Sequence, residues 1–80
     1  MSGTWHAVQY PGEGCVAWQC VGRHGGKLWR ISKPHPEDPE AGYRLSFNDG
    51  AHAGRMRIWI GVAHSKSIHA VFAAFRLLSL

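Results

Sequence analysis

The spacing of apolar residues changes along this chain, and the change limits the folds it can adopt. Tyr43, Leu45 and Phe47 alternate with polar residues, which is the two-residue period of a strand with one buried face. After Ser65 the apolar residues recur every three or four positions, as on one stripe of a helix. That stripe comprises Ile68, Val71, Phe72, Phe75 and Leu78. The pattern therefore predicts strands first and a helix last.

Turn signals divide the part before the helix into strand-like segments. Residues 11–14, 23–26 and 48–50 are rich in glycine, proline or asparagine, which favours tight turns. Residues 33–42 hold three of the four prolines and predict a loop, because proline cannot donate to a strand ladder. The predicted strands are 4–10, 15–21, 27–32, 43–47 and 55–62.

These elements predict the α+β class: a small antiparallel sheet of four or five strands with one C-terminal helix packed on one face. Eighty residues allow one domain, spanning 1–80. Ser65 is the predicted N-cap of the helix. The helix stripe is expected to pack on the apolar face of the sheet, formed by Trp29, Ile31, Tyr43, Leu45, Phe47, Met56, Ile58 and Ile60.

The net charge of +4 is concentrated in one half of the chain. Residues 1–40 are neutral overall, whereas residues 41–80 carry five Lys or Arg and a single acid, Asp49. A basic half favours an anionic partner such as nucleic acid or an acidic protein surface, although the same charge can serve solubility alone. The start of the chain does not resemble an export signal, and charges interrupt its most apolar stretch. We therefore expect a cytoplasmic protein that does not bind a membrane.

Strand alternation gathers the basic residues on the sheet face opposite the helix. Several arginines with an aromatic ring can hold phosphates and a stacked base, or can anchor an acidic protein partner. The alternative is an ordinary wet face of an antiparallel sheet. The predicted partner-binding residues are Arg30, Arg44, Arg55, Arg57 and Trp59.

Metal and catalytic chemistry have little support in this sequence. Cys15, Cys20, His24 and His35 would need a second close pair of ligands to match a structural zinc site, and the two histidines are too widely spaced. We expect both cysteines to be free thiols. Three of the five acids lie in the proline-rich loop, and no catalytic motif is evident. We expect no enzyme activity, no metal and no cofactor.

The sequence thus favours a non-catalytic binding module. Its first expected role is a small intracellular inhibitor or adaptor that occupies a protein or nucleoprotein partner through the Arg/Trp face. Domains of this size are common among accessory proteins of phages and mobile elements, anti-CRISPR inhibitors included. The alternative is a nucleic-acid-binding sheet that contacts phosphates and a stacked base. A homodimer, formed through a strand edge or through Trp5 and Trp18, is compatible with both roles.

Overall fold

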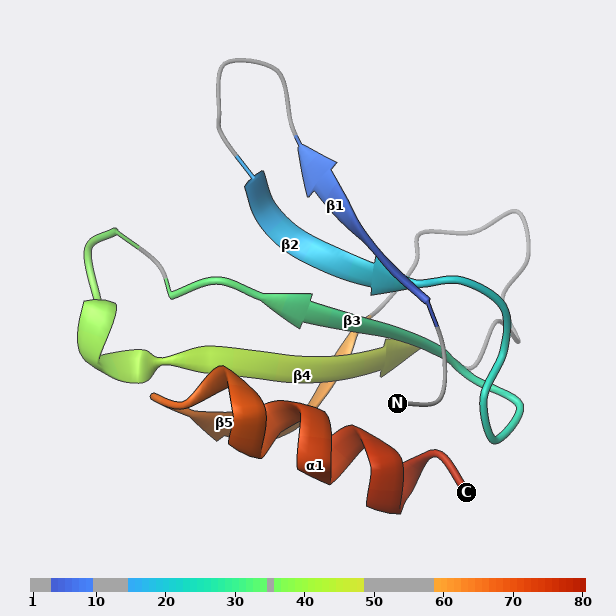
Figure 1. Cartoon of the computed structure of the whole chain (residues 1–80). Coiled ribbons are helices and arrows are strands. Elements are labelled where there is room, and N and C mark those ends of the chain that lie inside the picture. Colours follow the sequence, from blue (N-terminus) through green and yellow to red (C-terminus); the bar gives the residue numbers. More distant parts are fainter. Residues whose placement is uncertain (1–3, 10–14, 35, 49–58) are drawn as a thin grey trace.

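The described residues form an antiparallel sheet of five strands followed by a C-terminal α-helix (Figure 1). The structure is a computed structural model, and it describes residues 4–9, 15–34, 36–48 and 59–80. The strands are β1 (Trp5–Gln9), β2 (Cys15–Cys20), β3 (Leu28–Ser32), β4 (Tyr43–Asn48) and β5 (Ile60–Ser65); a 3-10 turn, η1 (Pro39–Ala41), precedes β4, and α1 (Ile68–Leu78) follows β5. The predicted α+β class and its C-terminal helix are confirmed.

Each strand pairs with its sequence neighbours, so the sheet order is β1-β2-β3-β4-β5. The first hairpin belongs to the main sheet, because Trp18 of β2 pairs with Ile31 of β3. The turn between β2 and β3 forms as predicted, and His24 and Lys27 exchange backbone hydrogen bonds across it. The predicted turns at 11–14 and 48–50 lie outside the described residues, apart from Asn48 at the end of β4.

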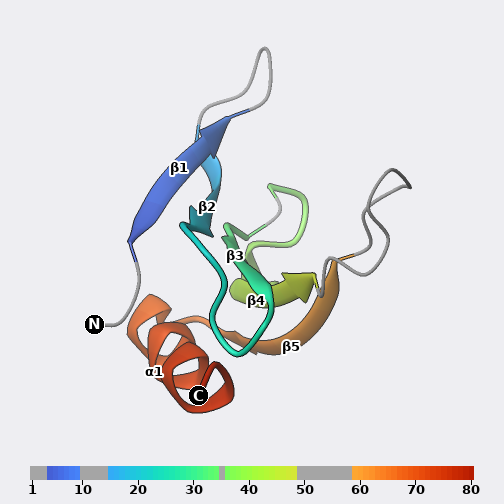
Figure 2. The same ribbon diagram turned by 90° about the vertical axis from the view of Figure 1, so that its right-hand side faces the viewer.

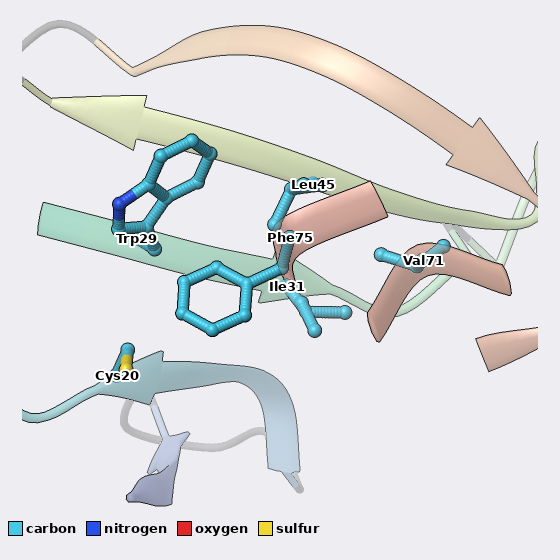
Figure 3. Packing of buried hydrophobic residues seen from close by; sticks show 6 residues of the cluster. All are labelled: Cys20, Trp29, Ile31, Leu45, Val71 and Phe75. Atoms are coloured by element: carbon cyan, nitrogen blue, oxygen red, sulfur yellow. The ribbon is translucent and has the colours of Figure 1, made fainter. Parts of the chain in front are cut away.

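The core lies between α1 and the sheet (Figure 3). Phe75 of α1 is fully buried, and its ring makes T-shaped contacts with the rings of Trp5 and Trp29 at centroid distances of 5.0 and 5.4 Å. The buried cluster consists of Cys20, Trp29, Ile31, Leu45, Val71 and Phe75. Rings of this size remove much apolar surface from water, which helps so short a chain to remain folded.

Two expected core residues are largely exposed. Ile60 has 49% of its surface exposed because it begins β5, which is an outer strand of the sheet that the described residues form. Leu78 has 50% exposed because it ends α1. Their assignment to the core was therefore wrong, whereas Tyr43, Phe47 and Phe72 do pack against the buried cluster. Met56 and Ile58 lie outside the described residues.

The last strand and the helix both sit later than predicted. β5 continues to Ser65, because Tyr43 pairs with Ser65 and Arg44 pairs with His64. His64 is therefore a strand residue, although the predicted strand ended at residue 62. Ser67 takes the N-cap position expected for Ser65, whose hydroxyl instead accepts a hydrogen bond from the Ser67 amide. Among the described residues, no helix has the length and hydropathy to cross a lipid bilayer.

The β3–β4 connection is held close to the start of α1. Gly42 has a φ of 73°, and a Cβ atom there would lie 2.5 Å from the carbonyl oxygen of Ser65. Only glycine suits this position, because the left-handed backbone and the close approach both exclude a side chain. Glu40 and Lys66 form an exposed ion pair across the same junction. The connection is therefore anchored at its C-terminal end, and the sheet separates it from most of α1 (Figure 2).

Candidate functional site

The face of the sheet opposite α1 carries two parallel rows of polar residues, which we call the polar face. In the first row Arg30, Ser46 and Gly61 lie side by side across β3, β4 and β5. The second row comprises Ser32, Arg44 and His64. The two rows keep this alignment because β5 accommodates one extra residue, Val62, as a bulge between them.

These rows form the floor of a pocket of about 570 Å³. The floor is hollow because serine and glycine occupy positions where larger side chains would fill the space. The walls come from the β3–β4 connection on one side and from Trp59, just before β5, on another. The connection contributes Lys33, Asp38, Ala41 and Gly42. A volume of this size is typical of ligand-binding pockets.

Arg30 and Trp59 form a cation–π pair within the pocket lining. The guanidinium carbon of Arg30 lies 4.3 Å from the centre of the Trp59 ring. A cation over an indole gains roughly 0.5–2 kcal/mol, depending on how far it is shielded from water. The Nε of Arg30 is buried and has no hydrogen-bond partner among the described residues. An unpaired buried donor is costly, and such costs are often found at functional sites.

Arg44, like Lys33, is an exposed cation of the pocket lining. Its side chain crosses the neighbouring strand, since a Cβ on Gly61 would lie 3.3 Å from the Cδ of Arg44. Gly61 therefore provides the space in which Arg44 lies. Among the described residues, Arg30, Lys33 and Arg44 form no ion pair, while Asp38 is the single carboxylate lining the pocket. The pocket lining thus carries a net positive charge and suits an anionic ligand.

The structure brings together three of the five predicted site residues. Arg30, Arg44 and Trp59 line the same pocket, whereas Arg55 and Arg57 lie outside the described residues. Sequence analysis missed the small floor residues and the wall. Strand alternation places Ser32, Ser46 and Gly61 on the same face as the arginines. Their alignment across three strands, however, depends on strand pairing and on the bulge at Val62. The missed residues are Ser32, Lys33, Asp38, Ala41, Gly42, Ser46, Gly61 and His64.

Two of the residues considered for a zinc site, Cys20 and His24, do not line the pocket. Cys20 is a free, buried thiol on the helix side of the sheet, and burial raises the pKa of this thiol despite an opposing backbone hydrogen bond at Thr4. His24 belongs to the β2–β3 turn, where its ring packs against Phe75 and its carbonyl accepts a hydrogen bond from the Trp29 indole. Both residues therefore support the core. His35 lies outside the described residues.

Comparison with known proteins does not add to this picture: no family model, curated protein or solved structure matches the chain.

Proposed function

We propose that this chain is a non-catalytic binding module whose polar face holds a strand of nucleic acid. The observation that carries the proposal is the basic pocket, in which the cation–π pair of Arg30 and Trp59 lies beside Arg44, which forms no ion pair among the described residues. Arginines bind phosphates, and aromatic or guanidinium planes stack on bases. The combination provides both contacts that sequence-tolerant nucleic-acid binding needs.

The shape and charge of the pocket favour nucleic acid over a protein surface. Protein interfaces of the usual kind are centred on a well-packed apolar cluster with exposed aromatic anchors. Here the aromatic residue is half-buried beneath a guanidinium, and the floor consists of serine, glycine and cations. A concave basic surface accepts an inserted phosphate more readily than a flat partner.

Fluorescence anisotropy with labelled oligonucleotides tests this proposal. We expect binding that weakens steeply as salt rises from about 50 to about 200 mM, because each neutralised phosphate releases counterions. Arg44→Gln should lower both the affinity and the salt slope. Arg76→Gln is the matched control, since it removes one exposed charge from α1, away from the pocket. If no oligonucleotide binds at low salt, nucleic acid is not the partner.

A second candidate function is the inhibitor or adaptor role, with a protein or nucleoprotein complex as partner. It is favoured by two apolar side chains on β5, an outer strand of the described sheet. Ile60 and Val62 are 49% and 39% exposed, and they flank Gly61 of the pocket floor. Apolar residues on an open strand edge can pair with another chain. A small accessory protein of the anti-CRISPR kind would fit this role.

The two candidate functions predict that different substitutions abolish partner binding. If the partner is a protein docked on β5, replacing Ile60 and Val62 together with serine should abolish capture of that partner. Leu77→Ser is the control, because Leu77 is 74% exposed on α1. Capture should also persist at high salt, since apolar burial is not screened. Retained capture by the double variant would exclude this docking mode.

A further inference from the structure

We infer that the pocket seats one unstacked nucleotide of a single strand, with its base against the Arg30–Trp59 pair and its phosphate beside Arg44. This inference rests on the proposed function and deepens it. A basic surface alone would bind single and double strands alike through their phosphates. The pocket of about 570 Å³ on the same surface is large enough for a chemical group of the ligand to enter.

The floor of the pocket leaves room for such a group. Ser46 of β4 is the middle residue of the first row, and the side chain of Arg44 lies over its neighbour Gly61 of β5. Ser46 is 3% exposed, so it lies at the bottom rather than at the rim. The β3–β4 connection forms a wall beside this floor, and the absence of a Cβ at Gly42 lets that wall lie close to the Ser65 carbonyl. The cavity is therefore built by strand pairing and by a backbone contact.

The chemistry of the lining matches the two halves of a nucleotide. The guanidinium carbon of Arg30 lies 4.3 Å from the centre of the Trp59 ring, within reach of a cation–π contact, and both residues line the pocket. Such planes accept a base by stacking. Arg44 is exposed and has no carboxylate partner among the described residues, so its fork of N–H donors is available for a phosphate.

A duplex cannot satisfy both contacts. Its bases are stacked on one another and paired, so a protein reaches only their edges in the grooves. Exposing the face of a base requires unpairing and unstacking, which an already single strand does not need. The geometry therefore implies a preference for single strands, and it implies that a free mononucleotide binds weakly at the same place.

The test compares two variants that keep the charge of the protein. Ser32→Leu places an apolar side chain on the pocket floor, opposite Arg44 in the strand register. Arg30→Lys keeps the cation but removes the planar guanidinium. Gln19→Leu is the matched control, because Gln19 pairs with Arg30 on the same face and does not line the pocket. The probes are a labelled oligothymidylate, its duplex with oligodeoxyadenylate, and thymidine 5′-monophosphate as competitor.

We expect the wild type to prefer the single strand, and thymidine monophosphate to displace it at millimolar concentration. Ser32→Leu and Arg30→Lys should each weaken single-strand binding by about tenfold or more, the usual effect of losing a stacked base, with the salt slope unchanged. Gln19→Leu should bind as the wild type does. Circular dichroism of each variant checks that it is folded.

The inference and the proposed function fail in different ways. If both pocket variants bind the single strand as the wild type does, or if the duplex binds equally well, the pocket takes no nucleotide and the basic face alone binds phosphates. The inference is then overturned and the proposed function stands. If the wild type binds neither oligonucleotide at low salt, both are overturned.

Discussion

Single residues in this protein differ sharply in how much of the fold depends on them. Phe75 is fully buried and contacts Trp5, His24 and Trp29. Phe72 lies one position from Val71 on the same stripe but is only half-buried, with Trp5 as its ring partner. We expect Phe75→Ala to cost about 3–5 kcal/mol in the free energy of unfolding, and Phe72→Ala distinctly less. Urea denaturation followed by circular dichroism measures both. Equal losses would mean that the helix is rotated relative to the sheet.

Gly42 is the residue whose backbone conformation matters most. A substitution to alanine must adopt a left-handed φ and must also push the Ser65 carbonyl away. The φ alone costs about 1–3 kcal/mol, and the steric overlap adds to it. We expect Gly42→Ala to lower the thermal midpoint and to distort the pocket wall. Gly26→Ala is the control, since Gly26 has a similar φ but open space around it. A Gly42→Ala variant no less stable than Gly26→Ala would show that the close approach is easily relieved.

At the scale of the elements, the β3–β4 connection meets the segment just before α1 at two places, the Glu40–Lys66 ion pair and the close approach of Gly42 to Ser65. The ion pair of Glu40 with Lys66 is exposed on both sides, so it should contribute less than about 1 kcal/mol. The Gly42–Ser65 approach is a backbone contact and cannot be screened. We therefore expect Lys66→Ala to leave the thermal midpoint almost unchanged, at low and at high salt. A loss as large as that of Gly42→Ala would give the ion pair a structural role.

The junction also shows which parts of the fold the sequence could predict. Alternation of apolar residues within a strand is local, so the layers and the shared face of Arg30 and Arg44 could be predicted. Ser65 and Ser67 are both competent N-caps, and pairing of Ser65 with Tyr43 decides between them. The pocket depends on the same long-range information. Its floor requires Ser46 and Gly61 to align across strands, which no local pattern specifies.

At the scale of the whole molecule, the coupling between the β1–β2 hairpin and the helix-covered strands decides whether the protein unfolds as one unit. α1 packs mainly on β4 and β5, whereas the hairpin formed by β1 and β2 lies at the opposite edge of the sheet (Figure 1). Trp5 links the two parts, because its ring contacts both Phe72 and Phe75 of α1. Cys20 pairs with Trp5 across the hairpin and is 2% exposed within the core cluster. These contacts favour a single cooperative unit.

The thiol of Cys20 reports on that cooperativity directly. In a Cys15→Ser background, burial shields Cys20 and raises its pKa, so iodoacetamide should react only after the protein opens. If the molecule unfolds as one unit, the free energy of opening obtained from labelling should equal the free energy of unfolding from urea denaturation. Val21→Cys with both native cysteines replaced by serine gives the exposed control, because Val21 is 46% exposed beside Cys20. A labelling free energy far below the global value would mean that the hairpin opens alone. The Trp5 contacts with α1 would then be too weak to couple the hairpin to the rest of the sheet, and the helix-covered strands that carry the pocket would form the stable unit of the protein.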